Sequence, residues 1–220
     1  MISVAIDGPA GAGKSSISRL AAKRLGFIYV DTGALYRAVG LKFSLSGADT
    51  SLDCDIDGIL AETEVDIRFK EGEQRVYLDG RDVSDEIRTP TASMMASAVS
   101  ARPQVRAFLL EMQRKLAREN NVVMDGRDIG TVVLPEAEVK IYLTASAEVR
   151  AKRRLKELKE KGEKVTFKEV YDDMVKRDYN DMHREIAPLK KAEDAVVADT
   201  SDCSFDESVE LVLKIVRERI

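Results

Sequence analysis

Short apolar runs alternate with amphipathic stretches along most of the chain. The runs are rich in β-branched residues, which is typical of strands buried in a parallel sheet. They lie at residues 2–6, 27–30, 121–124, 139–143 and 195–199. Apolar positions with helical spacing occur at residues 14–26, 31–47, 91–120 (with an interruption near Pro103), 146–162, 166–182 and 204–219. This alternation predicts an α/β fold in which helices cover both faces of a parallel sheet.

Signals for helix ends accompany several of these stretches. Gly26 follows the first helical stretch and is expected to end it, because glycine readily closes a helix C-terminus. Thr166 with Glu169, and Ser204 with Glu207, have the spacing of a capping box. These pairs predict that helices begin directly after Thr166 and Ser204.

The middle of the chain follows a different pattern. Residues 65–69 and 75–78 read as two strands of a hairpin, and Asp79-Gly80 is a typical turn dipeptide that leads to a further short strand. This predicts a small antiparallel insert within an otherwise parallel α/β chain.

Composition restricts the class of protein. The 220 residues are 44% hydrophobic, which suffices for one packed domain. A net charge of −4 argues against a general nucleic-acid binder. No apolar run approaches the ~18 residues of a membrane span, and the N-terminal residues do not resemble a signal peptide. Cys54 and Cys203 are far apart and lack metal-ligand spacing, which favours free thiols in a reducing compartment. We therefore expect a cytoplasmic monomer without a membrane or nucleic-acid partner.

Charge is nevertheless uneven along the chain. Residues 150–164 contain eight basic and three acidic residues. A basic helix of this kind is either a solvated face or a local site for a polyanion, and this segment alone does not decide between them.

A phosphate-binding motif follows the first strand. Residues 8–15 read GPAGAGKS, which matches G-x-x-x-x-G-K-[ST] and stands between a predicted strand and a predicted helix, as this motif requires. Lys14 is expected to reach the β- and γ-phosphates of ATP, and the Ser15 hydroxyl is expected to bind Mg²⁺. The residues of this loop expected to contact ATP are Gly8, Pro9, Ala10, Gly11, Ala12, Gly13, Lys14, Ser15 and Ser16.

This loop alone leaves kinases, ATPases and GTPases open. The guanine-specific string Asn-Lys-x-Asp is absent from the sequence, and the chain is short for a motor or helicase core. A kinase that uses a nucleoside triphosphate and a small acceptor is therefore favoured.

The tetrapeptide Asp-Gly-Arg-Asp occurs twice, at residues 79–82 and 125–128. The first copy lies in the predicted hairpin insert, where it reads as a turn. The second copy ends an apolar strand of the main sheet, and ligands of open parallel sheets bind at the carboxyl ends of strands. Asp125 is therefore placed like a Walker-B acid near the metal, and Arg127 can act as a phosphate clamp. A buried salt bridge is the alternative role of Arg127.

Several further motifs resemble those of bacterial cytidylate kinases. They are IDGPAGAGKS near the start, DTGALYRA from Asp31, DVSDEIRT from Asp82, RPQVR from Arg102, DGRDIGTVV from Asp125 and RDYNDMHREIAPL from Arg177. The resemblance covers essentially the whole chain in family order. Thr32 stands where some family members have serine, which keeps a hydroxyl group there.

The resemblance implies a nucleoside-monophosphate kinase fold in three parts. The core would comprise residues 1–59, 104–149 and 190–220, the acceptor-binding subdomain residues 60–103, and the lid residues 150–189. The implied reaction transfers the γ-phosphoryl group of ATP, bound with Mg²⁺, to CMP or dCMP. In this reading the basic segment is a lid whose arginines close over the triphosphate.

Phosphoryl transfer needs in-line positioning and charge neutralisation, and little covalent chemistry. The cations expected to clamp the transferred group are Lys14, Arg127, Arg177 and Arg184. The lid residues expected on the ATP side are Arg150, Arg153 and Arg154. The metal is expected at Ser15 and Asp125, either directly or through water.

The acceptor site follows partly from residue chemistry and partly from the resemblance. Thr32, Arg37 and Arg127 would hold the acceptor phosphate, for which arginine forks are suited. The resemblance assigns the cytosine to Ser97, Arg106 and Asp128, and the sugar to Asp181 and Arg177; Arg184 also contacts the acceptor. An aspartate can accept from the cytosine amino group and an arginine can donate to its carbonyl and N3. The single histidine, His183, is expected at the lid surface.

Two alternatives remain. One is another small P-loop kinase with UMP, AMP or shikimate as acceptor, and the other is a non-enzymatic nucleotide-binding regulatory domain. A shikimate-type enzyme needs no cytosine pocket, and a regulatory domain has no reason to keep arginines at positions 37, 127, 177 and 184 beside Lys14. The sequence does not rank CMP, dCMP and UMP, which differ by one or two hydrogen-bonding groups.

Overall fold

A computed structural model of the chain describes residues 1–48, 55–70, 72–160 and 162–220. Cys54 lies outside the described residues, and so does Lys161, which belongs to the basic segment. Cys203 carries a free, half-buried thiol. No helix of the described ranges is both long and apolar enough to cross a membrane.

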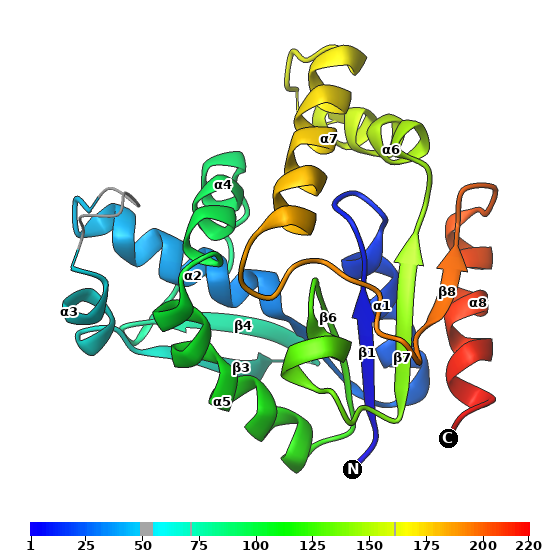
Figure 1. Ribbon diagram of the computed structural model, residues 1–220, viewed down its shortest axis with the longest axis horizontal. Helices are drawn as coiled ribbons and strands as arrows, with labels where there is room; N and C mark the ends of the chain where they lie inside the picture. The colour runs from blue at the N-terminus through cyan, green and yellow to red at the C-terminus, as the bar shows by residue number, and fades with distance from the viewer. Residues whose placement is uncertain (49–54, 71, 161) are drawn as a thin grey trace.

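Five parallel strands form the main sheet of the described chain, in the order β2-β6-β1-β7-β8 (Figure 1). Their bounds are Ser3–Asp7 for β1, Ile28–Asp31 for β2, Val122–Gly126 for β6, Val139–Thr144 for β7 and Val196–Asp199 for β8. The predicted parallel sheet is confirmed, with strand ends shifted by one or two residues. β1, the first strand, lies at the centre of the sheet, so the loop after it emerges in the middle of the carboxyl edge.

Helices cover both faces of this sheet. On one face α1 (Lys14–Leu25) lies beside α8 (Phe205–Arg217), and both pack on Val4 and Ile6 of β1. On the other face α5 (Pro103–Glu119) and a π-helical turn, η1 (Ile129–Val133), pack on Ala5 of the same strand. Adjacent residues of β1 point to opposite faces and both faces are covered, which explains why the whole strand is buried and why its central residues, Val4, Ala5 and Ile6, are apolar.

The predicted helix ends are also confirmed. Gly26 caps α1 in the left-handed conformation, with φ of 71°. Thr166 and Glu169 form the capping box of α7 (Phe167–His183), and Ser204 and Glu207 form that of α8.

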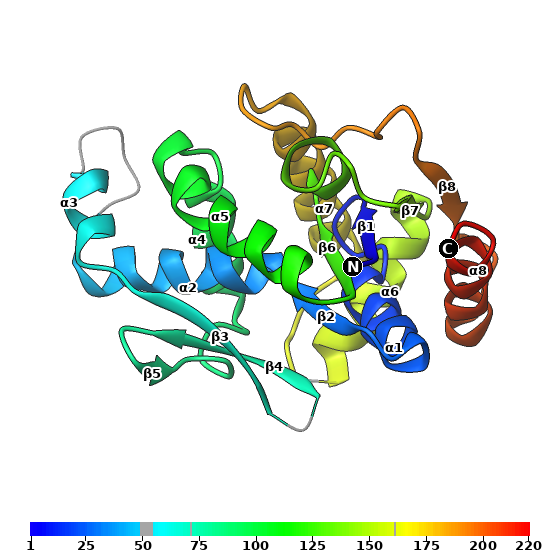
Figure 2. The same ribbon diagram turned by 90° about the horizontal axis from the view of Figure 1, so that it is seen from below.

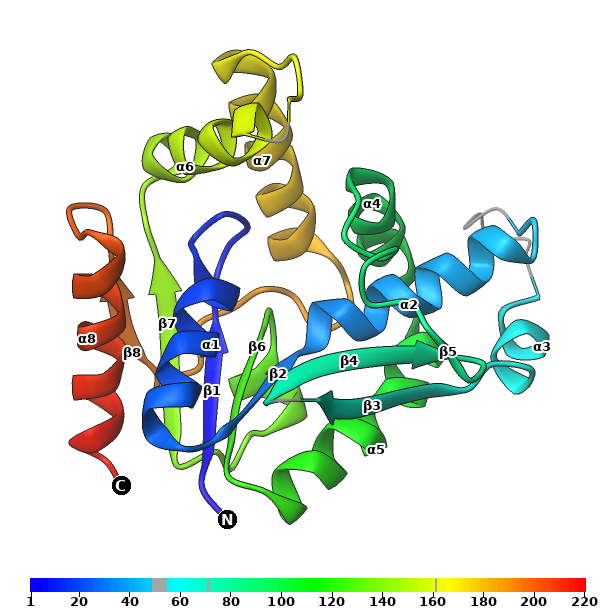
Figure 3. The same ribbon diagram turned by 180° about the vertical axis from the view of Figure 1, so that it is seen from behind.

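The antiparallel insert has the strand order β3-β4-β5 within the described residues. It consists of β3 (Val65–Lys70), β4 (Glu73–Leu78) and β5 (Arg81–Asp82). Asp79 and Gly80 both have positive φ, 51° and 78°, as the predicted two-residue turn requires. The insert lies beside the edge strand β2 of the main sheet (Figure 3).

A second hydrophobic core joins this insert to the rest of the molecule. Buried residues of α2 (Thr32–Leu45), α3 (Ile56–Ala61), α4 (Pro90–Val99) and α5 pack together with those of the insert. Figure 2 shows this group on one side of the main sheet and α8 on the other. The helix α3 and the π-helical turn have no counterpart among the predicted elements.

The basic segment lies in α6 (Ala147–Glu160), which pairs with α7 above the carboxyl end of the main sheet (Figure 1). The two helices share a small apolar cluster of their own, formed by Ala151, Val170 and Met174. This pair of helices therefore stands over the loop that follows β1.

Candidate active site

The glycine-rich loop approaches its surroundings too closely for larger residues. A Cβ atom at Gly8 would lie 2.0 Å from the carbonyl oxygen of Leu143 in the neighbouring strand β7. Gly13, which precedes α1, has a φ of 85° that favours glycine. Because the loop leads into the N-terminus of α1, its amide groups and the helix dipole create a site for an anion.

Lys14 is the first residue of α1, and its side chain turns back over this loop. Its Nζ donates to the carbonyl of Pro9 at 2.8 Å, and the side chain is buried. Burial, together with the positive charge of Arg127 nearby, lowers the pKa of Lys14 to about 7. A bound phosphate would offset this cost, so the site is electrostatically suited to a polyanion.

Asp125 connects the loop with the end of strand β6. Its two carboxylate oxygens accept hydrogen bonds from the Ser15 hydroxyl and the Tyr29 hydroxyl, each at 2.9 Å. Burial, and then the negative charge of Asp31, raises the pKa of Asp125 to about 6. A hydroxyl and a carboxylate side by side are oxygen ligands of the kind that Mg²⁺ prefers, so these residues fit the expected metal.

The expected acceptor-phosphate residues lie next to Asp125. Thr32 donates its hydroxyl hydrogen to the carbonyl of Asp125 at 2.8 Å. Arg37, one helical turn further along α2, donates from Nη2 to Asp31 at 2.8 Å. The Nε of Arg37 is buried and has no hydrogen-bond partner among the described residues, so part of its guanidinium group is available to an anion.

Arg127 lies between the loop and the lid. Its Nε donates to Asp181 of α7 at 2.7 Å. Arg177, also on α7, is largely buried, and its Nε lacks a partner within the described chain. Burial and the nearby charge of Arg127 lower the pKa of Arg177 to about 10. The structure thus brings Lys14, Arg127 and Arg177 together, with Asp181 paired to Arg127 and Asp125 close to Lys14.

A buried carboxylate, Asp128, lies between two arginines. It forms ion pairs with Arg106 of α5 and, at 3.5 Å, with Arg184. Burial raises the pKa of Asp128, while the two arginines act against this shift. Ser100 accepts hydrogen bonds from both arginines. Its carbonyl accepts from Arg106 at 3.2 Å, and its hydroxyl accepts from Arg184 at 3.3 Å. The Ser100 hydroxyl in turn donates to the carbonyl of Ser97, which places Ser97 at the edge of this cluster.

The three lid arginines occupy different environments. Arg150 is buried and donates to the carbonyl of Ala10 in the glycine-rich loop at 2.7 Å. Arg153 donates to the carbonyl of Thr200 at 2.7 Å, between lid and core. Arg154 pairs with Glu157 of its own helix at 3.0 Å. Of these three arginines of α6, Arg150 is the one that hydrogen-bonds to the loop within the described residues.

The outer face of the basic helix is solvated. Lys152 and Lys156 pair there with acidic residues one turn away along α6. His183 is exposed, as expected, and its Nδ1 lies 2.8 Å from the carbonyl of Tyr179. The segment therefore has a solvated outer face, while its Arg150 reaches the glycine-rich loop; the site for a polyanion stays a prediction.

Two buried carboxylates of the site were not anticipated. Asp7, at the end of β1, accepts from the amides of Ile129 and Gly130 at 2.8 Å each, and burial raises its pKa to about 6. Asp178 of α7 accepts from the amide of Ala10 at 3.1 Å and pairs with Arg150 at 2.6 Å. The position of Asp7 at a strand end was a sequence signal, whereas the contact of Asp178 with the loop was not visible in the sequence.

The first Asp-Gly-Arg-Asp copy lies within the insert and makes contacts there. Asp79 pairs with Lys42 at 2.6 Å, and the exposed Arg81 pairs with Glu86 at 2.7 Å. Asp82 pairs with Arg75 at 2.8 Å. The second copy instead supplies Asp125, Arg127 and Asp128 to one continuous site, as the preceding paragraphs describe.

Comparison with known proteins agrees with this geometry. A family model described as cytidylate kinase matches residues 4–218. Cytidylate kinases of Caldicellulosiruptor saccharolyticus and Caldicellulosiruptor bescii are 52% and 53% identical to the chain over 214 residues, which is 97% of this chain and 95% of each relative.

A crystal structure of an uncharacterized protein from Eubacterium ventriosum has the same fold. Its TM-score is 0.53 at 13% identity, and the match covers 100% of both chains. At this identity the likeness concerns the fold alone, whereas the family model and the sequence relatives span nearly the whole chain. The chain belongs to the cytidylate kinase family.

Proposed function

We propose that this protein is an ATP-dependent nucleoside-monophosphate kinase that phosphorylates CMP or dCMP and releases ADP with CDP or dCDP. The observation that carries the proposal is the juxtaposition of two sites along residues 125–128. Asp125 contacts Ser15 of the phosphate-binding loop, while Asp128 pairs with Arg106 in a buried cluster three residues away. One short segment therefore connects the glycine-rich loop to a buried cluster of charged groups that could recognise a pyrimidine.

The ATP site in this proposal consists of the glycine-rich loop, Lys14 and the lid residue Arg150. Lys14 neutralises charge on the β- and γ-phosphates. Ser15 and Asp125 hold Mg²⁺, directly or through water, and the ion when bound supplies further charge neutralisation. Arg150 holds the lid against the loop. Arg153 and Arg154 lie farther along the same helix, and a movement of the lid would bring them to the ATP side.

The acceptor phosphate lies between Thr32, Arg37 and Arg127 in this proposal. Arg127 is held by Asp181 through Nε and by the Gly126 carbonyl through Nη1, which leaves Nη2 for a phosphate oxygen. The buried, unpartnered Nε of Arg37 is a further donor. Arg177 adds a second partly uncompensated charge, and such charges stabilise the transferred group most strongly where water is excluded.

The acceptor base is placed at Asp128, Arg106 and Ser97. The amino group of cytosine donates to Asp128, and its carbonyl and N3 accept from Arg106. Without bound cytosine, Asp128 and Arg106 pair with each other. Binding of cytosine therefore replaces the hydrogen bonds of this ion pair by hydrogen bonds to the ligand. Arg184, which also pairs with Asp128, contacts the acceptor, and Asp181 with Arg177 contacts the sugar.

The reaction needs no separate catalytic base in this scheme. The acceptor phosphate is itself the nucleophile, and the protein aligns it with the γ-phosphate and neutralises developing charge. Lys14, Arg127, Arg177 and Arg184 perform this neutralisation. We infer that the protein acts as a monomer, because the scheme assigns no role to a second copy of the chain.

The division into core, acceptor-binding part and lid supports the same scheme. The lid helices have a small apolar cluster of their own and meet the core through polar contacts such as Arg150 with Ala10. An element with few apolar contacts to the core can move as a unit. The insert and α4 in turn join the core through α2 and α5.

The proposal predicts that ATP and CMP together protect the lid from trypsin. Exposed lysines of residues 150–164 should be cleaved readily in the free protein, and cleavage should slow about tenfold or more when both nucleotides hold the lid closed. Cleavage is followed by mass spectrometry of the fragments. ATP with GMP is the matched control, because GMP does not fit the pyrimidine pocket. Equal protection by CMP and GMP, or none by either, would contradict the proposal.

A further inference from the structure

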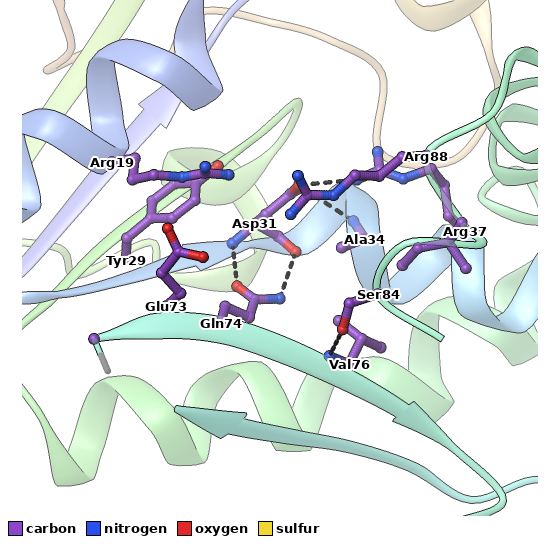
Figure 4. Close-up of a pocket in the computed structure, with 12 residues that line it drawn as sticks. Arg19, Tyr29, Asp31, Ala34, Arg37, Glu73, Gln74, Val76, Ser84 and Arg88 are labelled. Carbon is purple, nitrogen blue, oxygen red and sulfur yellow. Dashed lines mark hydrogen bonds and ion pairs between the residues drawn. The ribbon is translucent and has the colours of Figure 1, made fainter. Parts of the chain in front are cut away.

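One polar contact between the insert and the main sheet, within the described residues, is made by Gln74. Figure 4 shows Gln74 of β4 facing the main chain of Asp31, the last residue of the edge strand β2. Its Oε1 accepts from the Asp31 amide at 2.7 Å, and its Nε2 donates to the Asp31 carbonyl at 3.3 Å. The side-chain amide thus makes the pair of hydrogen bonds that a neighbouring strand would make.

Asp31 in turn controls the position of Arg37. One carboxylate oxygen of Asp31 caps helix α2 by accepting from the amide of Ala34 at 3.0 Å. The other oxygen accepts from Nη2 of Arg37 at 2.8 Å. Both side chains of this ion pair are about four-fifths buried, with exposed fractions of 21% and 20%. A displacement of the Asp31 main chain therefore moves the cap and the arginine together.

The arrangement around this pair is tight. A Cβ atom at Gly33 would lie 3.1 Å from both Nη1 of Arg37 and Oδ1 of Asp31. The adjacent cavity, which Gln74 and Arg37 line, measures about 30 Å³, room for one or two water molecules. Both amide atoms of Gln74 are engaged by the main chain of Asp31, so Gln74 acts on the position of its neighbours.

We propose that Gln74 is a positioning residue, which holds Arg37 in place for the acceptor phosphate by fixing the main chain of Asp31. The inference rests on the proposed function, which assigns Arg37 to that phosphate. Apolar packing of Val76 and Ile87 with α2 already joins the insert to the rest of the molecule. The insert is therefore held in place without Gln74. The hydrogen bonds of Gln74 add a link from the insert to Asp31, and through Asp31 to the acceptor site.

The test begins with Gln74→Leu, which keeps the bulk of the side chain and removes both hydrogen bonds to Asp31. KM for CMP should rise about tenfold, since Arg37 loses the support that both hydrogen bonds give to Asp31. KM for ATP and kcat should change less than about twofold, because the glycine-rich loop does not depend on this contact.

Two further variants separate positioning from general stability. Gln74→Glu retains an acceptor for the Asp31 amide but cannot donate to its carbonyl, so KM for CMP should rise by a smaller factor than in Gln74→Leu. Arg75→Ala, at the next position of β4, removes ion pairs with Asp82 and Asp85 inside the insert. It should leave KM for CMP unchanged even where the melting temperature falls. If Gln74→Leu does not fold, Gln74→Glu answers the same question.

A double-mutant cycle gives the decisive result. Arg37→Ala alone should raise KM for CMP, and Gln74→Leu added to it should raise KM no further, because the residue through which Gln74 acts is gone. Independent, multiplicative effects would overturn the positioning role. An unchanged KM in Arg37→Ala would overturn the assignment of Arg37 in the proposed function and the inference with it. A raised KM in Arg37→Ala but not in Gln74→Leu would overturn the inference alone.

Discussion

Replacement of Arg127 by alanine is expected to lower kcat/KM for CMP about 10³-fold, which corresponds to about 4 kcal/mol of transition-state stabilisation. Arg127 lies near Lys14 with 19% of its side chain exposed, and Asp181 holds its Nε at 2.7 Å. The substitution removes a fixed positive charge where charge develops during transfer, and water cannot replace it with the same geometry. Steady-state kinetics with ATP and CMP measure the change.

The sequence provides a matched control for this experiment. Arg81 occupies the same place in the first Asp-Gly-Arg-Asp copy, but it is exposed and pairs with Glu86 on the surface of the insert. Arg81→Ala should change kcat/KM less than about twofold, because exposed ion pairs contribute little. Equal losses in the two variants would show that the second copy has no special role in phosphoryl transfer.

The second large effect is expected for Asp128→Asn. The substitution keeps the size of the side chain but removes the charge between Arg106 and Arg184, and an amide nitrogen replaces one acceptor oxygen. KM for CMP should rise about 100-fold, since charged hydrogen bonds of this kind contribute about 1.5–3 kcal/mol each. KM for ATP should stay within about twofold, because Asp128 does not contact the glycine-rich loop. Kinetics with each substrate varied in turn measure this split.

Asp82→Asn is the corresponding control, since Asp82 ends the first copy of the tetrapeptide. It pairs with Arg75 in the insert and should affect neither KM value. Thermal unfolding of both variants shows whether the buried substitution has disturbed the fold. A folded Asp128→Asn variant with an unchanged KM for CMP, or with an equal rise in both KM values, would contradict the base-recognition role.

Local signals were sufficient to predict most of the secondary structure. The strands of the main sheet are short apolar runs, and the ends of α1, α7 and α8 carry glycine or capping-box signals that the structure confirms. The turn at Asp79-Gly80 was predictable because few residues tolerate two successive positive φ angles. Such features depend on neighbouring residues only, and a single sequence contains that information.

Features that depend on distant contacts were not predictable in the same way. The π-helical turn at residues 129–133 begins where the amides of Ile129 and Gly130 bind Asp7, more than a hundred positions earlier in the chain. The helix α3 is short, and it has too few residues for an amphipathic pattern to appear. In both cases the tertiary structure decides the local conformation.

The candidate site shows the same division. The glycine-rich loop and Asp125 were expected from motif and strand position, and the structure brings them within hydrogen-bond distance. The place of Arg154 beside ATP stays a prediction, because Arg154 pairs with Glu157 on its own helix and only a bound nucleotide would show whether it turns inward. Gln74 could not be expected at the acceptor site, because its role depends on how the insert lies against β2.

The central claim is tested most directly by ADP release from ATP and Mg²⁺ in the presence of a single acceptor. The acceptors are CMP, dCMP, UMP, AMP, GMP and shikimate, each measured at the same concentration. Turnover with CMP and dCMP should exceed that with AMP, GMP and shikimate by about 100-fold or more, because only a cytosine satisfies both Asp128 and Arg106. Fastest turnover with AMP or shikimate, or no stimulation of ADP release by any acceptor, would contradict this account.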